Sequence, residues 1–305
     1  MLLLNLKRDF ILIVSTQAFI MKLQTRPWCI GGIDMKFKIG FSAEAYNETQ
    51  NVVTTKHCSI AAPKPSVVQV RFSGRGSSLA YYNDRFDLHV GDMVYVDGKL
   101  EGQRGVVTEV SYNFKIKVSD YKRVIAVVNT EVHGEFFMAG SHFVSFDRNA
   151  LPVEQAITWF KAPEKEGDEY LIGSGDDNSF RLDDLKGMKI SSAIAERGHE
   201  YYMENKVRYI CLDGFRGYAI VEGSEAYEVE FEFHNGEIRN LICSCFCSYT
   251  CKHEFAVMLQ LRETLEAIEK HYAKQYEETG YFAAVHKGTL FAFAVDGKDS
   301  GVFKL

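Results

Sequence analysis

Cysteine is scarce in this chain, and the few cysteines are unevenly placed. The 305 residues contain 7 cysteines, and four of them lie between Cys243 and Cys251. A secreted scaffold held by disulfides is short and spreads its cysteines through its loops. Sulfurs this close in sequence do not close useful loops. The pattern therefore argues against a disulfide framework and favours an intracellular protein, which we expect to be cytoplasmic.

The sequence also lacks an excess of positive charge and a long hydrophobic run. With a formal net charge of -6, the chain as a whole does not attract nucleic acid or an anionic membrane, so such a partner requires a local basic patch. The apolar run at 10–21 is interrupted by Ser15, Thr16 and Gln17 and is too short to span a bilayer. No small-residue cleavage site follows it cleanly. We therefore expect neither a signal peptide nor a membrane partner.

The apolar character of residues 1–34 has an explanation other than a signal peptide or a membrane anchor. The residues GGID before Met35 can be encoded by a purine-rich ribosome-binding sequence at bacterial spacing from an ATG codon. This observation gives the hypothesis that translation of a bacterial gene begins at Met35. Residues 1–34 would then be poorly ordered or a misassigned start.

Catalytic motifs are absent as well. The sequence contains no ATPase phosphate-binding loop, no transposase acid triad and no nucleophile elbow. We therefore expect a protein that is not an enzyme. The remaining catalytic alternative is a hydrolase or redox enzyme that uses Cys247 as its reactive thiol.

The N-terminal half contains the pattern of a small β-barrel. Short alternating apolar runs, separated by glycine and aspartate, fill 67–128. The stretch at 91–110 resembles the KOW motif of SH3-like barrels, with Gly105 at the glycine of that motif. We expect an SH3-like barrel domain over 35–148, either purely structural, which is favoured, or binding RNA or a protein. The cations that could share one face of it are Arg71, Arg75, Lys115, Lys117, Lys122 and Arg123.

The C-terminal half predicts an antiparallel sheet with helices. Residues 149–186 open with a helix that has Pro152 near its first turn and continue as an acidic linker. In the next domain, 187–278, a helix up to about 205 precedes strands at 207–212, 217–222, 227–233 and 238–242. A long amphipathic helix follows from 254. Residues 279–305 predict a C-terminal β-hairpin, and the overall fold class is α+β.

The cysteine cluster lies between the last of these strands and the long helix. Cys243 and Cys245 are two residues apart at a strand end, so their side chains point to the same side. Cys251 and His253 lie at the start of the helix, whose partial positive charge favours thiolates. Three thiolates and one imidazole give the closed tetrahedral ligand set of structural zinc, Zn²⁺. Cys247 either replaces Cys245 as a ligand or is a spare thiol, and the second role is favoured.

The spacing CxC, five residues, CxH resembles the SWIM zinc finger. The resemblance extends to the segments ERGHEYYMENKVRYI, VEGSEAYEVEFEF and CKHEFAVMLQL around the ligands. It implies that Cys243, Cys245, Cys251 and His253 hold zinc on a ββα unit, and that the protein binds DNA or protein partners.

The balance of charged residues favours a different class of partner for each half of the chain. Acidic residues exceed basic ones in 189–278, which favours a protein partner for the zinc domain, whereas the weakly basic barrel is the better candidate for DNA or RNA. We therefore expect a non-catalytic adaptor that binds a protein, a nucleic acid, or both.

Overall fold

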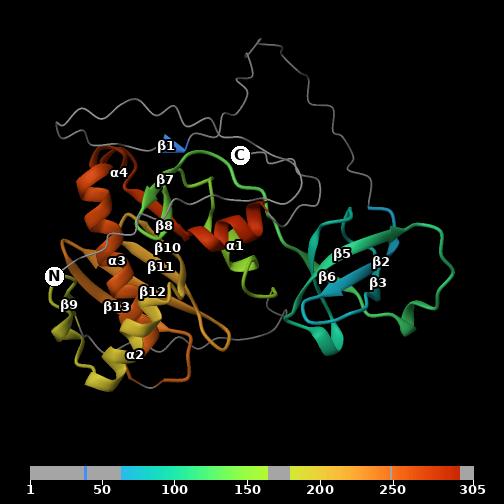
Figure 1. The fold of residues 1–305 in the computed structure, drawn as a ribbon, viewed down its shortest axis with the longest axis horizontal. Helices are drawn as coiled ribbons and strands as arrows, with labels where there is room; N and C mark the ends of the chain where they lie inside the picture. The colour runs from blue at the N-terminus through green and yellow to red at the C-terminus, as the bar shows by residue number, and fades with distance from the viewer. Residues whose placement is uncertain (1–37, 40–62, 164–178, 248, 296–305) are drawn as a thin grey trace, which may run out of the picture. The chain divides into compact units, whose positions relative to one another are not determined.

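The structure is a computed structural model that describes residues 38–39, 63–163, 179–247 and 249–295. The hypothesis about residues 1–34 and most of the predicted acidic linker lie outside these residues. Within the described residues the strands form two antiparallel sheets, in the orders β3-β2-β5-β4-β6 and β1-β7-β8-β14-β10-β11-β12-β13-β9 (Figure 1). The chain is therefore of mixed α+β class, as the sequence predicts.

The smaller sheet comes from the region of the predicted barrel. Its strands are β2 (Ser66–Phe72), β3 (Leu79–Asn83), β4 (Met93–Val96), β5 (Arg104–Ser111) and β6 (Val124–Val127). Buried side chains that alternate along β2 and β5 fill its core, among them Val68, Val70 and Val107. A parallel bridge between Tyr82 and Arg123 brings the two edges of the sheet together at one point. The described residues do not close a barrel, so the SH3-like barrel stays a prediction.

The larger sheet contains the four strands expected in the C-terminal half. They are β10 (Val207–Asp213), β11 (Arg216–Glu222), β12 (Ala226–His234) and β13 (Glu237–Cys243), and each pairs antiparallel with the next. The other strands are β1 (Lys38–Ile39), β7 (Phe136–Ala139), β8 (His142–Ser145), β9 (Phe180–Arg181) and β14 (Tyr281–His286).

The predicted domain boundary at 148 differs from the structure. Strands β7 and β8 lie before this boundary, yet β8 pairs with β14, with Val144 opposite Ala284. The residues 136–145 therefore belong to the larger sheet, together with the C-terminal half. A strand pattern identifies a strand but not its distant partner. The prediction therefore grouped this hairpin with the strands that precede it in the chain.

The helices match the expected positions except near the C-terminal end. They are α1 (Val153–Thr158), α2 (Ser192–Met203), α3 (Lys252–His271), α4 (Ala273–Thr279) and α5 (Lys287–Leu290), with short 3₁₀ turns η1 (Gly98–Leu100), η2 (Val118–Asp120) and η3 (Leu185–Met188). The hairpin predicted over 279–305 is wrong in its described part, because β14 is followed by α5 and a π-helical turn, η4 (Phe291–Val295). Strand β14 finds its partners in β8 and β10 instead.

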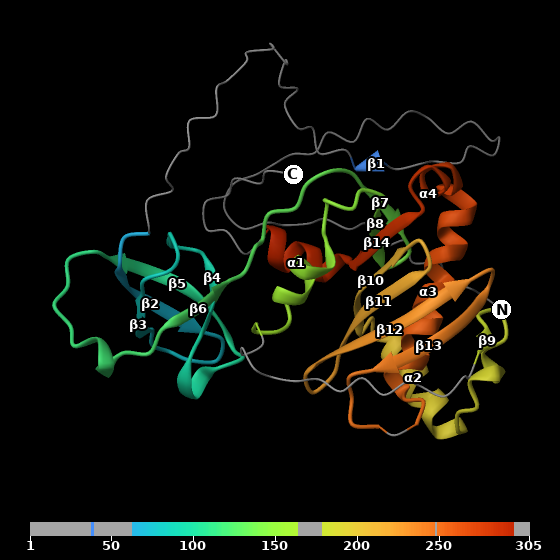
Figure 2. The ribbon, with the colours of Figure 1, turned by 180° about the vertical axis from the view of Figure 1, so that it is seen from behind.

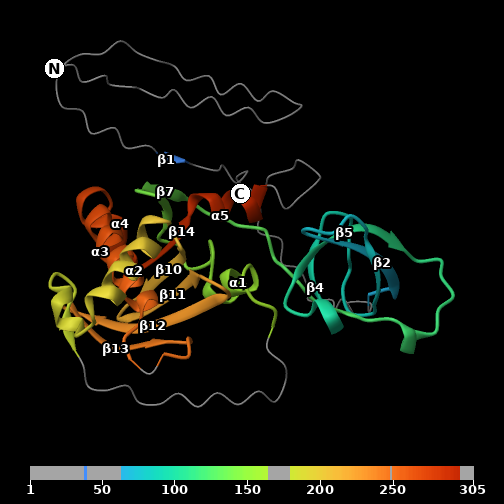
Figure 3. The ribbon, with the colours of Figure 1, turned by 60° about the horizontal axis from the view of Figure 1, so that its bottom comes forward.

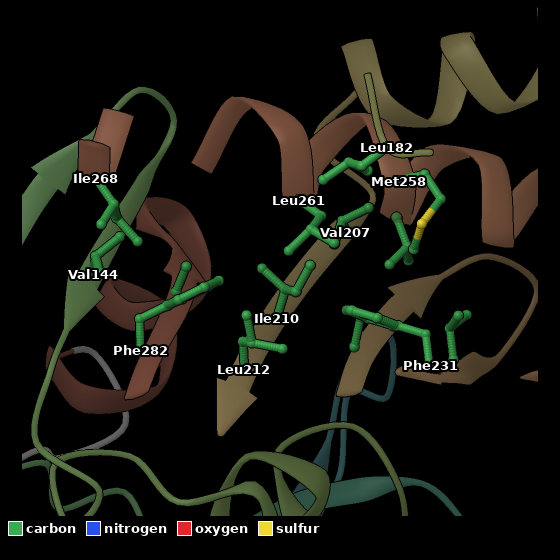
Figure 4. Close-up of a cluster of buried hydrophobic side chains, with 14 of the residues drawn as sticks. Val144, Leu182, Val207, Ile210, Leu212, Phe231, Met258, Leu261, Ile268 and Phe282 are labelled. Carbon is green, nitrogen blue, oxygen red and sulfur yellow. The ribbon is translucent and has the colours of Figure 1, made fainter. Parts of the chain in front are cut away.

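Helices cover both faces of the larger sheet. Helix α3 packs along one face and α2 lies beside α3 (Figures 2 and 3). In Figure 4, Leu261 of α3 points toward Ile210 of β10 in the core below this helix. On the opposite face, Trp159 at the end of α1 packs with Tyr209 and Cys211 of β10. Burial on both faces explains why β10 is almost continuously apolar.

The described part of the chain contains no helix that combines the length and the apolar character needed to cross a membrane.

Candidate metal centre

The structure brings together the four residues that the sequence singles out. Cys243 is the last residue of β13, Cys245 lies in the bend that follows, and Cys251 and His253 stand at the start of α3. The three sulfurs and one imidazole nitrogen all lie within 4.8 Å of one another. His253 Nδ1 is 3.7 Å from the Sγ atoms of both Cys243 and Cys251.

These separations fit a small cation in the middle of the four atoms. Zinc bonds to sulfur are about 2.3 Å long and those to nitrogen about 2.0 Å, so the ligands of a tetrahedral site lie roughly 3.5–3.8 Å apart. Cys251 and His253 are buried and the other two cysteines are half-buried. A cation held here would be largely enclosed by its ligands.

The end of β13 is fixed by its pairing with β12. Cys243 lies opposite Val229 in the sheet. Beyond it, the backbone N–H of Ser244 donates to Glu228 O, and Ser244 Oγ accepts from the N–H of Glu228, both at 2.9 Å. The chain therefore stays attached to β12 for one residue past the strand, which sets the position of Cys245.

The start of α3 is fixed by a capping box. Cys251 is the N-cap residue, and its Sγ accepts a hydrogen bond from the N–H of Glu254 at 3.5 Å. In return, Glu254 Oε2 accepts from the N–H of Cys251 at 2.7 Å. Each side chain satisfies a backbone N–H that the helix leaves open. The helix start thus holds Cys251 toward the cluster, and its partial positive charge favours a thiolate there.

The pKa values of the three thiols differ because the thiols are close enough to interact with one another and are partly buried. The pKa of Cys251 is lowered, chiefly because the Cys243 thiol donates a hydrogen bond to it. The same bond, together with burial, raises the pKa of Cys243. Burial is the main cause that raises the pKa of Cys245 to about 12. Without a cation the cluster therefore keeps protons that a bound cation displaces.

Comparisons with family models, curated proteins and solved structures found no match to this chain. The assignment of the candidate metal centre therefore rests on the geometry and chemistry of its own side chains and of the residues that contact them.

The remaining cysteines in the described residues lie outside the cluster. Cys247 is exposed and is not among the four residues whose ligand atoms converge. Cys211 is buried in β10, and burial raises the pKa of its thiol to about 12. A thiol with so high a pKa is not a nucleophile at neutral pH. The structure therefore brings Cys245 into the cluster and leaves Cys247 beside it.

Two neighbours of the cluster, Glu254 and Tyr227, have roles that the sequence pattern alone does not predict. Glu254 caps the first turn of α3, and its burial raises the pKa of its carboxyl to about 8. Tyr227 lies on the strand predicted at 227–233, and its ring stacks on His253. The spacing of an N-cap residue and a glutamate three residues later was a signal for the capping box.

Proposed function

We propose that this chain is a non-catalytic, zinc-binding adaptor of SWIM type that acts in the cytoplasm and binds a protein partner. The observation that carries the proposal is the convergence of three sulfurs and one nitrogen within 4.8 Å of one another. This soft donor set favours zinc over calcium, magnesium or manganese, which prefer oxygen. The placement of the ligands on β13, its following bend and α3 is consistent with a ββα zinc unit.

The ligand set also supports a structural role for the metal. Three thiolates and one imidazole fill a tetrahedral coordination shell, whereas catalytic zinc keeps one position open for water. Zinc held by Cys243, Cys245, Cys251 and His253 would join the end of β13 to the first turn of α3. Its contribution would be folding free energy, and a hydrolytic role has no support from this donor set.

The loop between the second and third ligands supplies a surface for a protein partner. Phe246 is 102% exposed and Tyr249 is 86% exposed. Because Cys245 and Cys251 flank this loop, a bound metal would hold both of its ends. Large aromatic side chains are enriched among the residues that dominate protein–protein binding energies. Phosphate is a poor partner here because acidic residues outnumber basic ones in 189–278.

The double variant Phe246→Ala/Tyr249→Ala is expected to bind the partner at least about 30-fold more weakly, the effect of losing a binding hot spot. Zinc content and the urea midpoint of unfolding should stay at their wild-type values, because both rings lie in solvent. The partner is first recovered by co-purification with the native full chain, and its affinity is then measured by titration calorimetry.

The matched control is Met203→Ala, which removes another exposed apolar side chain, 63% exposed at the end of α2. Met203→Ala should bind like the wild type. Equal affinities of the wild type and the double variant would remove the loop from the interface.

A second candidate is a nucleic-acid surface on the smaller sheet. The guanidinium of Arg123 lies 5.2 Å from the centre of the Tyr82 ring, and Phe114 meets the same ring edge-on at 6.4 Å. The nearby Lys115 and Lys122 are exposed. Aromatic rings beside cations are typical of surfaces that bind single-stranded nucleic acid. This surface would let the protein bridge a nucleic acid and a protein.

Binding of a mixed-sequence single-stranded oligonucleotide, DNA or RNA, tests this candidate. The logarithm of the association constant is expected to fall with the logarithm of salt concentration, with a slope of roughly -0.7 per phosphate neutralised. Charge reversal at Lys115 and Lys122 should reduce that slope. Absence of binding at low salt would exclude the candidate and leave the protein partner alone.

A further inference from the structure

The imidazole of His253 has an unusual environment for a metal ligand. Its Nδ1 faces the sulfurs, while its Nε2 is buried and has no hydrogen-bond partner among the described residues. A histidine that binds a metal usually donates its other N–H to a carboxylate, a carbonyl or water, which fixes the orientation of the ring. Here another interaction must fix it.

Two tyrosine rings contact His253 instead. Tyr227 of β12 stacks on the imidazole, with ring centres 4.2 Å apart and an angle of 18° between the planes. Tyr201 of α2 meets it at an angle of 60°, with centres 5.3 Å apart. We call Tyr201 and Tyr227 the aromatic clamp. The clamp contacts a ring face and restricts rotation about the side-chain bonds of His253.

The two tyrosines are themselves held in place. The hydroxyl of Tyr227 hydrogen-bonds to Ser224 Oγ at 2.7 Å, and Lys252 Nζ lies 4.4 Å from the centre of the Tyr201 ring. A Cβ atom at Gly223 would lie 2.9 Å from Tyr227 Cε2 and 3.3 Å from the Tyr201 hydroxyl. A glycine at this position therefore lets both rings approach the site.

Helix α2 also reaches the site because a glycine allows it. A Cβ atom at Gly198 would lie 2.8 Å from Phe255 Cδ1 and 2.9 Å from the carbonyl oxygen of Lys252, both in the first turn of α3. Any larger residue would push α2 away from that turn. The close approach places Tyr201, three residues later on α2, against His253.

We propose that Tyr227 and Tyr201 are the positioning residues of the metal site, and that they orient His253 so that Nδ1 faces the three thiolates. This inference rests on the proposed zinc site. Free rotation of the ring would carry Nδ1 away from the sulfurs, so a metal would have to restrict that rotation on binding. The aromatic clamp restricts it beforehand and thereby raises metal affinity.

The test compares Tyr227→Leu, which removes the flat ring but keeps an apolar side chain, with Tyr227→Phe, which keeps the ring and loses only the hydroxyl. Zinc affinity is measured by competition with a chromophoric chelator. Tyr227→Leu is expected to bind zinc about 10–100-fold more weakly, the usual range for losing the support of a ligand. Tyr227→Phe should stay within about threefold of the wild type.

Substitution with Co²⁺ separates positioning from general stability. The visible d–d bands report ligand geometry, so Tyr227→Leu should change their position or intensity, while Tyr227→Phe should keep the wild-type spectrum. A tyrosine that only stabilised the fold would lower the unfolding midpoint of the metal-free chain and leave the Co²⁺ spectrum unchanged. Tyr201→Leu and Tyr201→Phe give the same comparison if Tyr227→Leu does not fold.

The outcomes distinguish two failures. If the wild type binds zinc and the leucine variants match it in affinity and spectrum, the aromatic clamp is overturned and the zinc site stands. If the wild type binds neither zinc nor Co²⁺, the proposed function itself fails.

Discussion

Removal of the metal is expected to destabilise the full chain by about 10 kcal/mol, the order of magnitude of the binding free energy of a structural zinc site. The reason is that the cation would bind the end of β13 and the start of α3 at once, and α3 packs over the centre of the larger sheet. Equilibrium urea unfolding, followed by circular dichroism in the presence of zinc and of a strong chelator, measures the difference.

Two cysteine variants give this prediction its control. Cys251→Ser removes a ligand but keeps a residue that caps helices well, so its effect reports the metal and not the cap. Cys247→Ser removes an exposed thiol outside the cluster. Cys251→Ser should match the chelated wild type, and Cys247→Ser should match the zinc-bound wild type. Loss of metal in Cys247→Ser instead would assign the ligand role to Cys247.

Acid is expected to destabilise the fold through a second site, His142 of β8. Its side chain is fully buried, its Nε2 lies 2.8 Å from Val207 O, and its Nδ1 lies 2.9 Å from Ser141 Oγ. Burial is the main cause that lowers its pKa to about 3, and the charges of Lys287 and Arg208, with the nearby His286, act in the same direction. The folded protein therefore holds the His142 imidazole in its neutral form.

The direction of the pH effect follows from this lowered pKa. Between the unfolded value of about 6.5 and the folded value of about 3, the unfolded chain binds a proton that the folded chain does not. The free energy of unfolding therefore falls as pH drops through this interval, by up to about 5 kcal/mol near pH 3. The contribution is fully present above about pH 7.

His142→Gln tests the acid effect, because glutamine offers both a donor and an acceptor but does not titrate. Acid also releases a bound metal, so both chains are compared in the Cys251→Ser background. Between pH 6.5 and 4, the free energy of unfolding should fall more steeply for the chain with His142 than for the glutamine variant. Parallel curves would show that His142 does not contribute.

Local patterns were enough to predict the framework of the candidate site. Apolar runs bounded by turn residues predicted β10 to β13, with clear alternation in β12, and the amphipathic pattern that includes Leu261 and Ile268 predicted α3. The four ligands then lie close together because one short bend joins β13 to α3. Contacts between residues close in sequence depend mainly on local backbone geometry, so the spacing of the four ligands along the chain is enough to predict them.

Contacts between distant segments could not be predicted in this way. Nothing in the alternation of β8 says that it pairs with β14, more than a hundred residues later. The stacking of Tyr227 on His253 likewise depends on how α3 crosses the sheet, and the contact of Tyr201 with His253 depends on the close approach of α2 to α3 that Gly198 allows. Tyr227 alternates like any strand residue, so its pattern predicts burial and not its contact with His253.

Zinc analysis of the purified full chain, combined with X-ray absorption at the zinc edge, tests the central claim most directly. We expect one zinc per chain, with three sulfurs at about 2.3 Å and one nitrogen at about 2.0 Å. Less than stoichiometric metal, or a coordination shell made mainly of oxygen, would contradict a closed site built from Cys243, Cys245, Cys251 and His253.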